Sequence, residues 1–432
     1  MSPELVGLLG FVGLLTLLTL RVPVAIAMIA VAIVGNARIV DVDAALARTG
    51  ADAFQGAASF NLSVIPLFVL MGLLLAAAGL GADAYRALDV FLWRLRGGLA
   101  VATLGASALF ASVSGSAVAS ATTMSVVAVP EMRKFGYDSG LSAACAAVGG
   151  TLGALIPPSA VLVLYGVLTE EPIGDILLAG IVPGVMTAGL LMITAYLVVL
   201  RRPELGADTS TKPDLGHLAA LRLVWPVPVI FAISMGGIFY GVFTPTEAGG
   251  AGAALALIYG VVTRRLTWAG FVGALSRSVR TSAFIFLLVI AGKIFGFFLS
   301  VSRIPFTVTD FVGGLDAPRW LVIAAIFVVY FVLGALMDEI AILIIMTPIV
   351  YPVVIDLGYD GVWFGVLTIM MLLTGLITPP VGLITFVVSG VTNIELGKVF
   401  RATFPFTAAL SLAIGLVIAF PGIVVWLPNA AG

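Results

Sequence analysis

The stretch Gly375–Thr385, "GLITPPVGLIT", places two adjacent prolines inside an apolar run that is long enough to cross a membrane. Proline lacks the backbone N–H that a helix needs and its ring clashes with the preceding turn, so the pair interrupts a helix in the membrane interior. A second stretch, Gly153–Leu162, "GALIPPSAVL", has the same arrangement 222 residues earlier (375 minus 153). The chain is therefore predicted to contain two membrane helices that are broken in the same way.

The composition identifies the class of protein. Of 432 residues, 61% are hydrophobic and only 10% are charged, whereas a soluble domain carries about a quarter charged residues. Apolar runs near or above the ~20 residues that span a bilayer recur along the whole chain. These features predict an all-α polytopic protein in a lipid bilayer. The single cysteine, Cys145, excludes a disulfide framework and a cysteine-based metal site, and no basic patch suggests nucleic acid.

The constant offset extends far beyond the proline pairs and indicates an internal duplication. We therefore divide the chain into a first repeat (residues 1–200), a linker (201–218) and a second repeat (219–432). Landmarks that coincide without a gap include Pro23 with Pro245, Met124 with Met346, Pro130 with Pro352, Gly136 with Gly358, Pro157 with Pro379, and Pro183 with Pro405.

Each repeat contains one apolar run of an unusual length. Leu99–Pro130 and Trp320–Pro352 are each about 33 residues, too long for one span and too short for two spans with a loop. Polar breaks lie in their middles, at Ser112–Ser116 and Leu336–Glu339. We interpret both runs as re-entrant helical hairpins. The other five runs of each repeat then cross the membrane, and an odd number of crossings turns the second repeat upside down. Inverted repeats are typical of secondary transporters.

The basic residues support this topology. With the hairpins counted as non-crossing, 16 of the 21 Lys and Arg residues fall on one side and only Arg38, Arg48, Arg303 and Arg319 on the other, while Lys293 stays within a span. Because basic residues favour the cytoplasm, the linker 201–218 is expected inside and both termini outside.

Each hairpin break precedes a proline pair by about 40 residues. The two proline pairs lie in the apolar runs Leu141–Leu168 and Val362–Val391. Irregular backbone at membrane depth persists only where protein buries it or where it lines a cavity. Its free carbonyls suit a hard cation such as Na⁺, and its helix N-termini suit an anion. We predict one cation site at Ser114, Gly115, Ser116, Thr151 and Gly153, and another at Met337, Asp338, Thr374, Gly375 and Thr378. Substrate is expected between them, with Ser116, Thr122, Pro158, Lys293 and Pro380 as candidates.

Three charged features near this site permit more than one interpretation. Asp338, at a membrane-embedded tip, is costly unless it is paired or binds a cation. Glu339 either takes part or points to water or another helix. Lys293 either neutralises one of these acids or attracts an anionic substrate.

The stretch Arg264–Arg280 is basic and amphipathic, and predicts an interfacial helix. Asp138 and Asp360 follow the hairpins in short loops, where turn or cap chemistry explains them better than catalysis.

Together these residues resemble the large membrane subunit of tripartite ATP-independent periplasmic (TRAP) transporters. The resemblance covers essentially the whole chain, and its motifs are specific only in combination. They are "IPLFVLMG" (Ile65–Gly72), "LRGGLAVATLGASALFASVSGSAVASATTMSVVAVPEMRKFGYD" (Leu95–Asp138), "GALIPPS" (Gly153–Ser159), "GVFTPTEAG" (Gly241–Gly249), "MTPIVYPVVIDLGYD" (Met346–Asp360) and "LLTGLITPPVGLITFVVSGV" (Leu372–Val391).

The resemblance implies an elevator-type carrier in the bacterial inner membrane, with both termini periplasmic, that imports an organic anion such as a carboxylate or sugar acid by Na⁺-coupled symport. It implies two partners: a small four-helix membrane subunit and a periplasmic substrate-binding protein. It also implies Na⁺ sites at the hairpin tips and broken helices, and no cofactor besides the coupling ion. Two residues depart from the family pattern. Glu339 follows Asp338 where small hydroxyl residues are usual, and a lysine at position 293 is unusual.

Two alternative functions make different demands on the sequence. A stand-alone Na⁺- or H⁺-coupled dicarboxylate symporter of related fold remains open, and a neighbouring gene for a periplasmic binding protein would discriminate the two. An intramembrane protease does not fit, because zinc and serine types need histidines and His217 is the only one. An aspartyl type needs paired aspartates within spans, whereas Asp138 and Asp360 follow the hairpins in loops. We therefore expect a transporter and not an enzyme.

Overall fold

The computed structural model describes residues 1–206, 215–314 and 318–431, and this part of the chain is helical without strands. By length and composition, six of its helices qualify as membrane spans, or seven if the bent pair at His217–Val224 and Pro226–Phe239 counts as one. Many large apolar side chains, among them Trp268, Tyr240 and Phe404, lie exposed on the outside. An apolar exterior is what a lipid environment requires, and the predicted all-α polytopic fold is confirmed.

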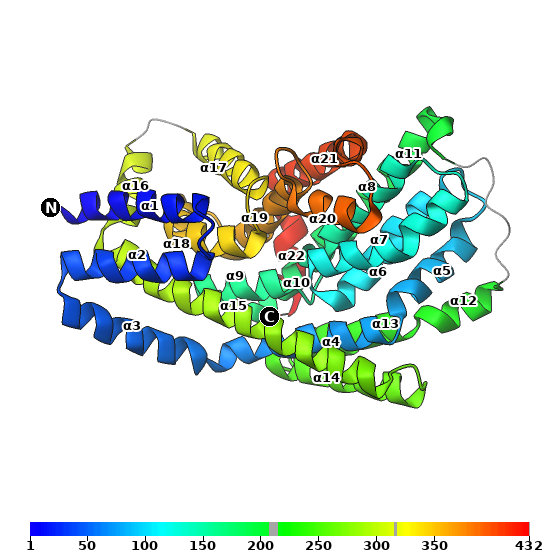
Figure 1. Ribbon diagram of the computed structural model, residues 1–432, viewed down its shortest axis with the longest axis horizontal. Coiled ribbons are helices and arrows are strands. Elements are labelled where there is room, and N and C mark those ends of the chain that lie inside the picture. The colour runs from blue at the N-terminus through cyan, green and yellow to red at the C-terminus, as the bar shows by residue number, and fades with distance from the viewer. Residues whose placement is uncertain (207–214, 315–317, 432) are drawn as a thin grey trace.

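One group of helices packs around a single long helix, α15 (Trp268–Val301), which contacts α2, α3 and α4. Figure 1 shows α15 running alongside α2 and then past α4 toward α14. The other members are α1 (Pro3–Thr19), α2 (Val24–Ile39), α3 (Val42–Ala57) and α4 (Val64–Ala77). Two further helices join through α4: α14 (Pro245–Val262) packs on α4, and α13 (Pro226–Phe239) packs on α14.

A second group contains the hairpins and the broken helices. Its first half comprises α6 (Gly98–Ser114), α7 (Ala117–Lys134), α8 (Ser139–Leu155), α9 (Ala160–Thr169), α10 (Ile173–Ala179) and α11 (Ile181–Arg201). Its second half comprises α17 (Arg319–Gly334), α18 (Glu339–Asp356), α19 (Gly361–Leu376), α20 (Leu383–Thr392), α21 (Leu396–Ala419) and α22 (Gly422–Ala431). Shorter elements complete the chain: η1 (Phe60–Ser63), α5 (Leu80–Leu92), η2 (Pro203–Leu205), α12 (His217–Val224) and α16 (Ile304–Gly313).

In the second group, the broken helix of each half packs on the hairpin of the other half. The helix α9, which follows the first proline pair, packs on α18 of the second hairpin, and α20, which follows the second pair, packs on α7 of the first hairpin. At the centre, α8 packs on α19, and nearly every residue of both helices is buried. The first break, residues 156–159, is therefore enclosed by protein, as membrane depth requires. In the second break, Pro379, Pro380 and Val381 are exposed.

The helices that follow the two hairpins, α8 and α19, each begin at an aspartate that caps the first turn. Asp138 accepts a hydrogen bond from the Leu141 amide (3.0 Å) at the start of α8, and Asp360 accepts one from the Trp363 amide (2.7 Å) at the start of α19. A carboxylate at this position satisfies an amide that the first helical turn leaves free. The interpretation of these two aspartates as cap residues is confirmed.

The prediction of a separate interfacial helix at Arg264–Arg280 is wrong. The residues from Trp268 onward form the first half of α15, which continues without a break into the following apolar segment. The matching part of the first repeat is interrupted by η1 (Phe60–Ser63), between α3 and α4. Serine and asparagine have low helix propensity, and Asn61 and Ser63 lie at this interruption. The corresponding positions of α15, 222 residues later, are Ala283 and Ile285. The predicted linker 201–218 also differs, because α12 begins at His217; its residues 207–214 lie outside the described part.

Candidate substrate and cation site

The first hairpin turns at two residues. Gly115 ends α6 in the left-handed region (φ 63°), which glycine adopts without strain. Ser116 then caps α7, and its hydroxyl accepts a hydrogen bond from the Ala119 amide (3.4 Å). Across the turn, the hydroxyls of Ser114 and Ser120 lie 2.7 Å apart. The tip thus presents hydroxyl groups and the N-terminus of α7, which carries a partial positive charge.

The first proline break lies directly against this tip. The Ala160 amide donates to the Gly115 carbonyl (3.3 Å). A Cβ at Gly115 would lie 2.6 Å from the Pro158 carbonyl oxygen, and one at Gly153 would lie 2.5 Å from the Ser116 carbonyl oxygen. Backbones this close exclude any side chain. Four of the five residues predicted for the first cation site, Ser114, Gly115, Ser116 and Gly153, are therefore brought together. Thr151 is buried in α8, with its hydroxyl donated to the Val148 carbonyl (2.6 Å).

The second tip and break meet in the same manner. The amides of Val381 and Gly382 both donate to the Ala335 carbonyl (3.2 Å each). A Cβ at Gly375 would lie 2.6 Å from the carbonyl carbon of Gly334. Thr374 and Thr378 follow one another on this segment, and their hydroxyls donate to the carbonyls of Met370 (2.9 Å) and Thr374 (2.6 Å). The structure thus brings Gly375 against the end of α17, beside the turn that carries Met337 and Asp338.

The two acids of this tip have different surroundings. Asp338 is partly exposed and caps α18, accepting a hydrogen bond from the Ile340 amide (3.0 Å). Glu339 is 5% exposed, and its Oε2 atom has no hydrogen-bond partner among the described residues. A buried carboxylate without a partner is costly when it is charged. The charged form of Glu339 would therefore need a partner that none of the described side chains supplies to its Oε2 atom.

A cavity of about 880 Å³ lies elsewhere, at the ends of α8, α11 and α21, whereas a cavity of about 730 Å³ adjoins the first tip. Ser114, Ser116 and Thr122 line one wall of the tip cavity, and Arg277 and Arg280 of α15 line another. Two guanidinium groups and a helix N-terminus that share one cavity suit an organic anion. Of the predicted substrate residues, Ser116 and Thr122 lie here.

The other three substrate candidates lie apart from this cavity. Pro158 is buried beside Gly115, and Pro380 is exposed in the second break. Lys293 lines a different cavity of about 570 Å³, together with Glu170 and Glu171 near the end of α9. Among the described residues, Lys293 forms no ion pair with Asp338 or Glu339.

Arg277 and Arg280 were missed as site residues because their sequence indicates only an amphipathic surface. Their spacing of three places both on one face of a helix, but no local signal shows which element that face opposes. The packing of α15 on α4, and of α4 on α6, supplies this information. Ser278 lies between the two arginines and donates a hydrogen bond to the Pro66 carbonyl (3.3 Å), which fixes the rotation of α15 against α4.

The fold matches a membrane transporter. The crystal structure of the Alcanivorax borkumensis YdaH transporter, described as having an unusual topology, superposes with a TM-score of 0.62 over 89% of this chain and 90% of that chain, at 16% identity. At this identity the similarity shows the fold alone. With its paired hairpins and broken helices, the chain is an all-helical polytopic membrane protein that shares this fold.

Sequence comparisons identify the family. The chain matches the model of the tripartite ATP-independent periplasmic transporter, DctM component, over residues 11–423. It is 32% identical to the C4-dicarboxylate TRAP transporter large permease protein DctM of Pseudomonas aeruginosa, over 88% of both chains. It is also 32% identical to the sialic acid TRAP transporter large permease protein SiaM of Vibrio cholerae, over 87% of both chains. The chain therefore belongs to the DctM family of large permease subunits of TRAP transporters.

A further relative is the isethionate TRAP transporter permease protein DctMQ of Oleidesulfovibrio alaskensis. It is 34% identical over 84% of this chain, but the match covers only 57% of that longer protein. The relatives are transport proteins for organic acids rather than enzymes, which agrees with the expectation from sequence.

Proposed function

We propose that this chain imports an organic anion, a carboxylate or sugar acid, by Na⁺-coupled symport. One observation carries the anion assignment: Arg277 and Arg280 line the same cavity as Ser114 and Ser116 at the N-terminus of α7. The names of the relatives agree with this class, since C4-dicarboxylates, sialic acid and isethionate are all organic anions. Substrate is placed between these arginines and the hydroxyls of the tip.

We infer that Na⁺ binds at the two tip–break junctions, in the residue sets predicted from sequence. The close backbone approaches at Gly115, Gly153 and Gly375 support this assignment, because they concentrate carbonyl and hydroxyl oxygens, the ligands that hard cations prefer. The sites differ in charge, since Asp338 occurs only at the second. This difference makes Asp338 the residue that most strongly attracts the second cation.

We further propose an elevator mechanism, in which the helices of the hairpin group move against the group around α15. The two groups are joined through a few helix pairs, such as α4 with α6 and α15 with α18, which supports their treatment as separate bodies. Since Arg277 and Arg280 belong to the cytoplasmic side in the predicted topology, the tip cavity corresponds to an inward-facing arrangement. That topology places both termini in the periplasm. The transporter is completed by a small membrane subunit and a periplasmic binding protein.

Loss of the two arginines tests the substrate site. We expect Arg277→Gln/Arg280→Gln to lower uptake roughly 10- to 100-fold, because a hydrogen bond to a charged group contributes about 1.5–3 kcal/mol. Uptake of labelled succinate and sialic acid would be measured in cells that also express the two partner subunits. The control is Arg86→Gln/Arg96→Gln, which removes two exposed arginines outside this cavity. Equal uptake by both variants, with wild-type KM, would show that Arg277 and Arg280 are not part of the substrate site.

The Glu339→Gln variant tests whether Glu339 binds Na⁺ as a carboxylate or is a neutral acid. Because its buried carboxyl has an oxygen without a partner, we expect the neutral form, which glutamine imitates in size and polarity. Glu339→Gln should keep the Na⁺-specific rise in melting temperature, measured in NaCl against KCl. If that rise disappears, the carboxylate itself binds the cation. If uptake responds to pH but not to Na⁺, the alternative of an H⁺-coupled symporter is favoured.

A further inference from the structure

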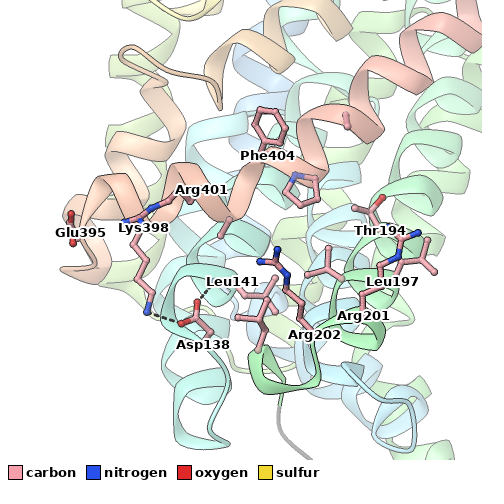
Figure 2. A pocket seen from close by; sticks show the side chains of 15 residues that line it. Asp138, Leu141, Thr194, Leu197, Arg201, Arg202, Glu395, Lys398, Arg401 and Phe404 are labelled. Carbon is pink, nitrogen blue, oxygen red and sulfur yellow. Dashed lines mark hydrogen bonds and ion pairs between the residues drawn. The ribbon is translucent and has the colours of Figure 1, made fainter.

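The cavity of about 880 Å³ lies away from the proposed substrate site, where the start of α8, the end of α11 and the first turns of α21 meet. Figure 2 shows its charged side chains: Arg201 and Arg202 come from the end of α11, Lys398 and Arg401 from α21. Two carboxylates, Asp138 and Glu395, also line it. Cationic side chains therefore outnumber anionic ones by four to two.

The excess of positive charge is concentrated on the arginines. Lys398 is neutralised, since its Nζ atom lies 2.7 Å from Asp138 Oδ2 and donates to Ser139 Oγ (2.9 Å). Although partial burial opposes it, this ammonium and the Leu141 amide hold the pKa of Asp138 below its usual value. Among the described residues no carboxylate pairs with Arg201, Arg202 or Arg401. Three guanidinium groups thus face one cavity without an anionic partner in the described chain.

The remainder of the cavity is apolar and reaches the outer surface of the molecule. Leu197 of α11 and Phe404 of α21 both line it, with 40% and 77% of their surface exposed. These two helices pack side by side and both qualify as membrane spans. The cavity lies at their polar ends, where a span leaves the hydrocarbon layer. Its charged part therefore has the depth of lipid headgroups, and its apolar part has the depth of acyl chains.

We propose that this cavity binds an anionic phospholipid. Its phosphate would be held by Arg202 and Arg401, and its acyl chains would lie along Leu197 and Phe404. Guanidinium groups bind phosphate oxygens in a bidentate manner, and basic pockets between membrane helices on the cytoplasmic side suit such headgroups. All four cations of the cavity belong to the predicted cytoplasmic side. A free anion would satisfy the arginines but would leave the exposed apolar wall without a partner, so a lipid fits better.

The test uses the purified full chain in detergent and measures its melting temperature after addition of dioleoylphosphatidylglycerol. Dioleoylphosphatidylcholine has the same acyl chains but no net charge, and glycerol 3-phosphate has the anionic headgroup but no acyl chains. At equal concentration, they separate the effects of acyl chains alone and of the headgroup alone from the effect of the complete lipid. We expect a rise with phosphatidylglycerol that exceeds the rise with either control. In Arg202→Gln/Arg401→Gln the rise should fall by at least half. Both arginines are exposed and outside the core, so the fold should tolerate their loss.

The matched control is Arg86→Gln/Arg96→Gln, which removes the same charge from the same predicted side and should keep the full rise. Four results would overturn the proposal. An equal rise with glycerol 3-phosphate would indicate a site for a soluble anion, and an equal rise with phosphatidylcholine would indicate non-specific lipid binding. A full rise in the pocket variant would place the lipid elsewhere. If phosphatidylglycerol has no effect but the pocket variant no longer co-purifies with the small subunit, the cavity is a protein interface instead.

Discussion

Asp338→Ala is expected to abolish most of the Na⁺-specific stabilisation of this permease. Asp338 is the one carboxylate among the ten residues proposed to bind the cations. It stands at the N-terminus of α18, and the broken helix it faces carries Gly375 near the end of α19. A ligand that binds only the folded state at 100 times its dissociation constant stabilises that state by about 2.7 kcal/mol. The melting temperature of the purified protein in NaCl, compared with KCl, should rise in the wild type and change little in the variant.

The matched control is Asp360→Ala. Asp360 also caps a helix of the second repeat, but it lies at the start of α19, away from the hairpin tip. Losing a cap costs about 1 kcal/mol in either place, so both variants should melt earlier in KCl. Only Asp338→Ala should lose the difference between the two salts. A wild-type protein that responds equally to NaCl and KCl would contradict Na⁺ binding at this tip.

Gly375→Ala is expected to disrupt the junction between the second tip and its broken helix. A Cβ at this position would lie 2.6 Å from the carbonyl carbon and 2.7 Å from the Cα of Gly334, and 2.8 Å from the Ala335 amide nitrogen. All three are backbone atoms, which cannot rotate aside as the end of a side chain can. Forcing extra atoms into a packed interior costs about 1–3 kcal/mol. The variant should melt at a lower temperature and lose Na⁺-dependent uptake.

Gly390→Ala is the control for this substitution. Gly390 lies within α20, and a Cβ there would meet nothing within 4 Å. Alanine in an open helical position favours the helix by roughly 0.5–1 kcal/mol over glycine, so the melting temperature should stay constant or rise. If the Gly375 and Gly390 variants are equally stable, the close approach of Gly375 to Gly334 is not essential to the fold.

Several parts of this architecture could be predicted without tertiary information because their signals are local. The proline pairs at 157–158 and 379–380 fall in the gaps between α8 and α9 and between α19 and α20. Proline acts on its own helical turn, so such breaks can be located from sequence. The turns at Gly115 and before Asp338 lie where polar residues interrupt apolar runs. Asp138 and Asp360 cap the helices that follow them, since a cap depends only on neighbouring residues.

Other features depended on which helices face one another. The sequence showed Arg277 and Arg280 only as one polar face, and the packing of α15 placed them across from the Ser116 tip. From sequence, Lys293 could neutralise Asp338 or Glu339 or attract an anionic substrate, but the structure places it in the lining of a cavity with Glu170 and Glu171. The sequence by itself thus determined the membrane class and the places where helices break, because periodicity, composition and proline act over a few neighbouring residues. Only the tertiary structure decided which side chains share a cavity, because this depends on the rotation of each helix against partners distant in the chain.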